Sequence, residues 1–114
     1  MRISEKQLID VAYGIRKSLY LALLCVDKNT KNEHLDICPQ EVLKSVEIRL
    51  YGLNEILNSP TGLPNILTSV IMAQTMLKVN NKDKDNYKLF RKYILDAGAE
   101  ILRFVNDYLI RDGD

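Results

Sequence analysis

Residues Leu63 to Leu77 read LPNILTSVIMAQTML and contain no charged side chain. The stretch is unusual within its own chain, because 27% of all residues are charged. A helix that is apolar around most of its circumference is normally surrounded by other elements. The stretch therefore predicts a central, largely uncharged helix with amphipathic segments packed around it.

Apolar residues recur at steps of three and four on both sides of this stretch, which is the spacing of a core-facing helical stripe. Ser4 and Gln7 fit a capping box at the start of the first stripe, and Ile3 with Leu8 fits a hydrophobic staple. Pro39 fits the first position of a second helix. The stripes predict four helices: from Ser4 to about Asp27, from Pro39 to about Leu57, from Leu63 to about Leu77, and from about Asp85 to about Arg111.

These features predict an all-α protein, an antiparallel four-helix bundle in which the uncharged third helix is central. Residues 1–114 form one domain, since this length is typical of a single domain. The turn residues 58–62 separate the second and third helices. Gly52 lies inside the second helix at a cost of about 1 kcal/mol relative to Ala, so we expect a neighbouring helix to approach it closely. Ala97, Gly98 and Ala99 offer a notch for another helix.

Charge and hydropathy narrow the classes of function. Sixteen basic and fifteen acidic residues give a net charge of +1, which supplies no long-range attraction to nucleic acid or to an anionic membrane. The first ten residues lack the apolar region of a secretory signal. The uncharged run is shorter than a membrane span, and turn residues precede it. We expect a cytoplasmic protein that does not enter a membrane.

The first helix carries a second stripe, away from its core-facing one, formed by Ile9, Tyr13, Arg16, Tyr20 and Leu24. Tyr and Arg among aliphatic side chains are enriched at protein–protein interfaces. The stripe predicts a surface that binds another protein or a second copy of the chain. The alternative is that the first helix is buried on two sides and each Tyr hydroxyl finds a partner at its edge.

No constellation for catalysis, cofactor binding or metal binding is evident. His34 is the only histidine, and the neighbouring Glu33, Asp36 and Cys38 do not form the spacing of a zinc site. Cys25 and Cys38 are expected to be reduced, half-buried thiols. Asp96 and Glu100 lie one turn apart, but Arg103 follows Glu100 by three residues and Arg111 follows Asp107 by four, which are ordinary ion-pair spacings.

We therefore expect a non-enzymatic protein-interaction module, of the adaptor, immunity-protein or inhibitor type, without cofactor or metal. The second hypothesis is a nucleic-acid-associated bundle. It requires the basic residues of the first, second and fourth helices to converge on one face: Arg16, Lys17, Arg49, Arg91, Lys92 and Arg103.

Overall fold

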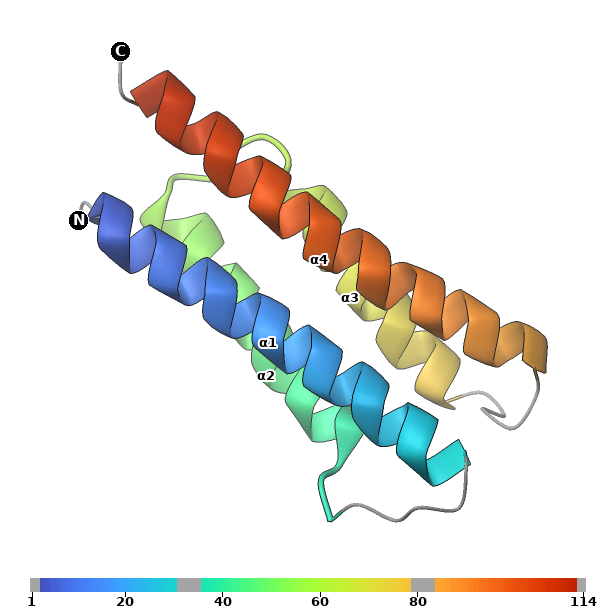
Figure 1. Ribbon diagram of the computed structural model, residues 1–114. Coiled ribbons are helices and arrows are strands. Elements are labelled where there is room, and N and C mark those ends of the chain that lie inside the picture. Colours follow the sequence, from blue (N-terminus) through green and yellow to red (C-terminus); the bar gives the residue numbers. More distant parts are fainter. Residues whose placement is uncertain (1–2, 31–35, 79–83, 113–114) are drawn as a thin grey trace.

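The computed structural model describes residues 3–30, 36–78 and 84–112. These ranges form four helices, α1 (Glu5–Thr30), α2 (Pro39–Ile56), α3 (Leu63–Lys78) and α4 (Lys84–Asp112), and contain no strand (Figure 1). The all-helical class and the four helices are confirmed. α1 continues past its expected end near Asp27 to Thr30. Residues 27–30 include neither Gly nor Pro to stop it, and Lys28 suits the negative end of the helix dipole.

In cross-section the four helices lie at the corners of a square, so that each packs against two of the others. Each helix in Figure 1 runs back along the one before it. α1 packs against α2 and α4, and α3 also packs against α2 and α4, whereas within the described residues the diagonal pairs α1–α3 and α2–α4 make no such contact. The fourth helix therefore closes the arrangement against the first.

This arrangement does not give α3 the central position that its sequence predicts. α3 occupies one corner, and its outward side is exposed at Asn65, Thr68 and Thr75. Thr68 and Thr75 donate their hydroxyls to the carbonyls one turn back, Pro64 at 2.9 Å and Ile71 at 3.0 Å. The absence of charge from Leu63 to Leu77 thus reflects neutral residues on the exposed side of α3, rather than burial on every side.

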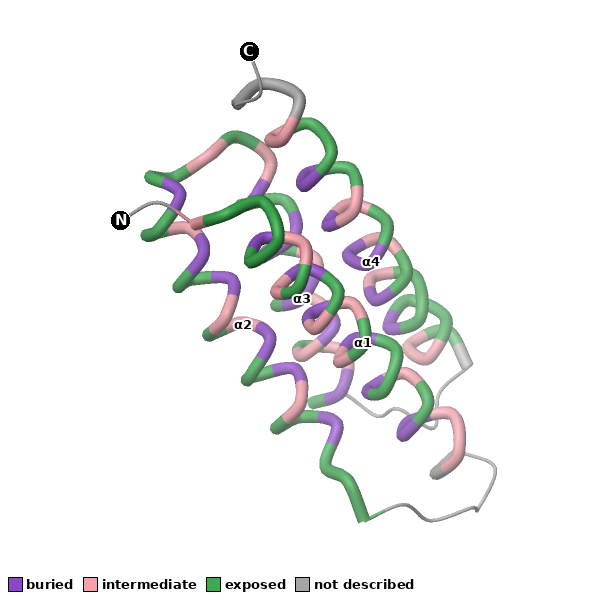
Figure 2. Tube along the Cα trace, turned by 60° about the vertical axis from the view of Figure 1, so that its left-hand side comes forward, coloured by how far each residue is buried: buried purple, intermediate pink, exposed green. Residues whose placement is uncertain are grey.

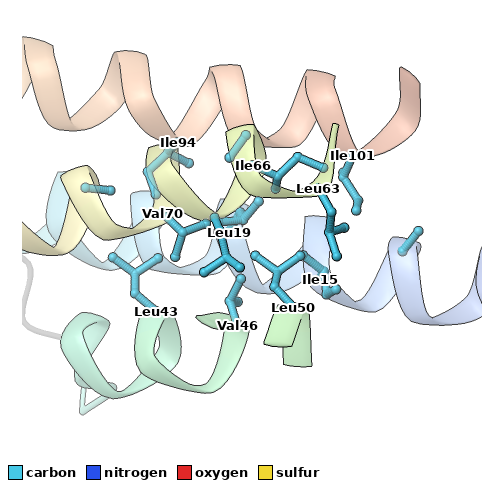
Figure 3. Packing of buried hydrophobic residues seen from close by; sticks show 14 of the residues in the cluster. Ile15, Leu19, Leu43, Val46, Leu50, Leu63, Ile66, Val70, Ile94 and Ile101 are labelled. Carbon is cyan, nitrogen blue, oxygen red and sulfur yellow. The ribbon is translucent and has the colours of Figure 1, made fainter. Parts of the chain in front are cut away.

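The core follows the stripes that the sequence predicts. One buried row runs along the inner side of each helix, coloured purple in Figure 2. The rows meet in a single hydrophobic cluster, in which Ile15 and Leu19 of α1 face Leu50 and Val46 of α2 (Figure 3). The core-facing stripes predicted for the first three helices are buried throughout: Leu8, Ala12, Ile15, Leu19, Ala22 and Val26; Leu43, Val46, Leu50, Leu53 and Leu57; Ile66, Val70, Ala73 and Leu77. The predicted stripe of α4 is buried at Phe90, Ile94, Ala97, Ile101 and Phe104, and only its end positions Tyr87 and Tyr108 remain partly exposed.

Local sequence signals fix the helix ends. Ser4 and Gln7 form the predicted capping box: the Ser4 N–H donates to Gln7 Oε1 at 2.9 Å, and the Gln7 N–H donates to Ser4 Oγ at 3.1 Å. Pro39 begins α2. Between α2 and α3 the backbone turns through left-handed conformations at Asn58, Ser59 and Gly62, with φ of 63°, 53° and 98°. Glycine adopts this conformation at the lowest cost.

The two singled-out helix glycines differ in their surroundings. No atom lies within 4 Å of the position that a Cβ on Gly52 would take, and the residue is exposed. The expected approach of a neighbouring helix at Gly52 is therefore wrong. Gly98 of α4 is buried, and a Cβ there would lie 3.2 Å from the hydroxyl oxygen of Tyr20. The notch around Gly98 thus receives a side chain of α1.

Candidate functional site

The predicted stripe on the first helix lies along the outward side of α1. We name Ile9, Tyr13, Arg16, Tyr20 and Leu24 the α1 outer face. Tyr13 is 57% exposed, Leu24 is 47% exposed and Tyr20 is 37% exposed. Arg16 and Ile9 are half-buried, and Ile9 packs against the core. The α1 outer face is therefore exposed to solvent at Tyr13 and Leu24, and it packs against the hydrophobic core at Ile9.

Tyr20 joins this face to α4. Its hydroxyl lies over Gly98, where any larger residue would crowd it. The guanidinium carbon of Arg16, one turn earlier, lies 5.1 Å from the centre of the Tyr20 ring, within the range of a cation–π contact. Arg16 and Tyr20, both on α1, thus hold each other in place beside the point where Tyr20 meets α4.

Arg16 carries an unusual group for a surface residue. Its Nε–H is buried and has no hydrogen-bond partner within the described residues. An unpaired buried donor costs about 1–3 kcal/mol. The cation–π contact with Tyr20 offsets part of that cost and keeps the guanidinium against the protein rather than extended into water.

A small groove separates the amino-terminal half of α1 from the end of α4. It has a volume of about 160 Å³, and Ala12 and Tyr13 of α1 line it opposite Leu102, Val105 and Asn106 of α4, with Ile9 and Leu109 at its end. The lining is mostly apolar. Tyr13 therefore borders both this groove and open solvent.

A larger, shallow depression lies on the outer side of α1, with a volume of about 530 Å³. We name it the α1 depression, and it is lined by Gly14, Lys17, Ser18, Tyr20, Leu21 and Leu24. It shares Tyr20 and Leu24 with the α1 outer face. The predicted stripe does not include Gly14 or Leu21. A glycine in the interior of a helix, one turn before a small residue, was the signal that could have found this surface.

The basic residues of the nucleic-acid hypothesis are divided between different parts of the surface. Arg49 of α2 lies against α1, where its Nη2 donates to Ser18 Oγ at 2.8 Å. Arg91 and Lys92 line a depression on α4 together with Lys88, and Asp96 contributes a negative charge there. Arg16 is engaged with Tyr20. Arg16 and Arg49 thus lie at α1, whereas Arg91 and Lys92 lie together on α4.

One polar contact ties the far end of α1 to α4. The Tyr87 hydroxyl donates to Asp27 Oδ1 at 2.5 Å. Burial raises the pKa of the Tyr87 hydroxyl above its ordinary value, and the hydrogen bond to Asp27 raises it further. Tyr87 therefore remains a neutral donor at physiological pH and joins α4 to α1 through this hydrogen bond.

The thiols and acidic groups do not form a metal site within the described residues, where no three His, Cys, Asp or Glu side chains gather. Glu33 and His34 lie outside those residues. Cys25 is buried, and burial raises the pKa of its thiol. Cys38 is exposed rather than half-buried, and its Sγ lies 3.2 Å from Gln40 Oε1. Both are free thiols.

None of the described helices is both long enough and apolar enough to cross a membrane. Comparison of the chain with protein-family models, with curated proteins and with solved structures finds no match.

Proposed function

We propose that the chain is a non-enzymatic protein–protein interaction module, of the adaptor, immunity-protein or inhibitor type, which binds another protein through the α1 outer face. One observation carries the proposal: Tyr13, Tyr20 and Leu24, three large apolar side chains within about three turns of one helix, are 37% to 57% exposed. Single exposed hydrophobic residues are normal, whereas clusters of them mark interaction sites.

The surroundings of Tyr20 favour tight binding at low entropic cost. The Gly98 notch and the Arg16 guanidinium restrict its ring before any partner arrives. A side chain that is already ordered loses less freedom on binding, where an ordered side chain otherwise costs about 0.5–1.5 kcal/mol. Tyr13 and Leu24 would then supply the contact area on either side. We place this activity in the cytoplasm, where both free thiols stay reduced.

The test compares partner capture by the native protein with capture by a double variant, Tyr13→Ser with Leu24→Ser. Tyr13 is 57% exposed and Leu24 is 47% exposed, and neither belongs to the buried core, so the double variant should keep its helical circular dichroism. Ile71→Ser is the matched control, because Ile71 is 40% exposed on α3. We expect the same protein to be retained by the native chain and by Ile71→Ser, and to be lost from the double variant.

Equal retention by all three proteins would contradict the proposal. The nucleic-acid hypothesis gives a different signature in the same samples. The chain has six Tyr and no Trp, so it absorbs weakly at 280 nm and bound nucleic acid would raise the 260 to 280 nm ratio. A high ratio that falls in strong salt would replace the protein-binding proposal with that hypothesis.

A further inference from the structure

The depression on α4 combines three cations with an exposed leucine. It has a volume of about 310 Å³ and is lined by Lys88, Arg91, Lys92, Leu95 and Asp96. We name it the α4 depression. Leu95 is 39% exposed, and none of the three basic side chains forms an ion pair with any residue that the structure describes. The α4 depression therefore presents a net positive charge beside an apolar side chain.

The α4 depression lies level with one end of the α1 outer face. Two contacts between α1 and α4 establish this: Tyr20 lies over Gly98, and Asp27 accepts a hydrogen bond from Tyr87. The two helices run in opposite directions (Figure 1). Leu24, which lies between Tyr20 and Asp27 along α1, is therefore level with the segment of α4 between the two contacts, and this segment holds the whole α4 depression.

The α4 depression opens beside α1 rather than on the far side of α4. At about 100° per residue, Arg91 lies about 40° and Leu95 about 80° around the helix from Tyr87, in the direction away from the buried row. Burial and Asp27 raise the pKa of the Tyr87 hydroxyl, and Arg91, close beside it, opposes them. Since the inner side of the α1–α4 contact is the buried core, the exposed residues that flank this contact on the two helices share one outer surface.

This shared surface has an apolar centre with cations on both sides. Leu24, 47% exposed, and Leu95 supply the apolar part. On the α1 side, Lys17 lines the α1 depression, which contains no acidic residue. On the α4 side, the three cations outnumber the single carboxylate of Asp96. The carboxylate of Asp27 is engaged by Tyr87. The surface is thus locally basic, although the net charge of the whole chain is only +1.

The composition of this surface favours an acidic protein as its occupant. Interfaces place positive patches against negative ones, and Arg and Lys form their strongest hydrogen bonds with carboxylates and phosphates. A phosphate backbone offers no apolar partner to Leu24 and Leu95, and Asp96 would repel it. A protein can instead place a basic side chain beside Asp96, an apolar side chain on the leucines and carboxylates on the cations.

We propose that the partner bound by the α1 outer face is an acidic protein surface that also covers the α4 depression. Its carboxylates pair with Lys88, Arg91 and Lys92, while its apolar side chains pack against Leu24 and Leu95. This inference rests on the proposed function, because it extends the α1 outer face across to α4. The cations select the partner by charge and speed its association, and the leucines bury apolar area.

The test uses synthetic helical peptides as probes, with binding measured by fluorescence anisotropy. The first peptide combines Leu and Glu, the second replaces each Glu by Lys, and a single-stranded oligonucleotide is the third probe. The native chain should bind the Leu/Glu peptide most tightly, and the affinity should fall as salt rises. Lys88→Glu with Lys92→Glu should raise the dissociation constant of that peptide more than about tenfold, because attraction becomes repulsion.

The matched control is Lys6→Glu with Lys44→Glu, which changes the net charge equally at exposed positions of α1 and α2. We expect it to bind the Leu/Glu peptide as the native chain does, and circular dichroism checks that both double variants are folded. Equal weakening by the two double variants would show an effect of net charge alone and overturns the proposal. Tighter binding of the Leu/Lys peptide or of the oligonucleotide than of the Leu/Glu peptide also overturns it.

These outcomes separate this inference from the proposed function. The native chain may retain a protein that the Tyr13→Ser with Leu24→Ser variant loses, while Lys88→Glu with Lys92→Glu retains it fully. The α1 outer face then binds its partner without the α4 depression, and only the acidic-partner inference is overturned. Light scattering covers the remaining occupant: a mass of twice 13.1 kDa that returns to 13.1 kDa in Lys88→Glu with Lys92→Glu would assign the surface to a second copy and overturn the inference.

Discussion

Ser4 and Gln7 show how two residues determine where α1 begins. Their reciprocal hydrogen bonds satisfy two backbone N–H groups at the first turn. Ser4→Ala should lower the free energy of unfolding by about 1 kcal/mol, because a free N–H group of the helix end loses its acceptor. Urea unfolding measures the difference.

Thr75→Ala is the matched control for this prediction. It also deletes a hydroxyl that donates to a backbone carbonyl, that of Ile71 at 3.0 Å, but inside a helix. Such a bond adds little, and Ala has the higher helix propensity. We expect unchanged or slightly higher stability, and a loss equal to that of Ser4→Ala would show that hydroxyl deletion, rather than capping, is being measured.

Glu47 makes the stability depend on pH. The Gln74 amide at 2.8 Å and the Lys44 ammonium at 3.1 Å hold the pKa of this carboxyl below its ordinary value, although burial opposes them. The lower pKa of the folded state adds stability above the pKa of the unfolded chain, and this stability is lost as the pH falls through the folded value.

Glu47→Gln should therefore lose less stability than the native protein between pH 7 and pH 3, measured by urea unfolding at both pH values. Gln74→Leu keeps the carboxylate but removes its closest donor, so it should reduce the same loss to a smaller extent. If both variants depend on pH as the native protein does, the contribution of Glu47 is refuted.

α3 shows what can and cannot be predicted for a whole element. Periodicity identifies its buried row, including Ile66, Val70 and Ala73, because a step of three or four residues places side chains on one face. Its corner position was not predictable, because the prediction of a central helix rested on the absence of charge. Neutral residues such as Thr and Asn leave an exposed side as free of charge as a buried one. The predicted helix contact at Gly52 was wrong for a related reason, since the sequence of one helix does not show which of its exposed positions a neighbouring helix approaches.

The two sides of α3 should therefore respond oppositely to charge. Val70 is fully buried, so Val70→Asp should unfold the protein by placing an unpaired charge in the core, a cost comparable to the total stability of about 5–15 kcal/mol. Thr68→Asp, on the exposed side, should remain folded. Circular dichroism and thermal melting distinguish the two variants, and a folded Val70→Asp protein would contradict the packing of α3.

At the scale of the whole molecule, α4 must close against α1, and this contact also positions part of the candidate site. The sequence predicted Ile9, Tyr13, Arg16, Tyr20 and Leu24 as one stripe, but it could not tell which of them would contact α4. The structure divides them: Tyr20 reaches Gly98, whereas Tyr13 and Leu24 are the most exposed. That division depends on a residue about 80 positions away in the chain.

Gly98→Val tests this closure. Even a Cβ at Gly98 would lie 3.2 Å from the Tyr20 hydroxyl, so the larger side chain must displace the Tyr20 ring from the notch. We expect a loss of about 1–3 kcal/mol in the free energy of unfolding.

Ala99→Val, at an exposed position one residue on, should cost only the helix propensity of a β-branched residue, at most about 0.7 kcal/mol. Tyr20→Leu should relieve part of the Gly98→Val penalty, because the displaced hydroxyl is gone. Equal losses for Gly98→Val and Ala99→Val, with no relief from Tyr20→Leu, would mean that Tyr20 does not occupy the notch.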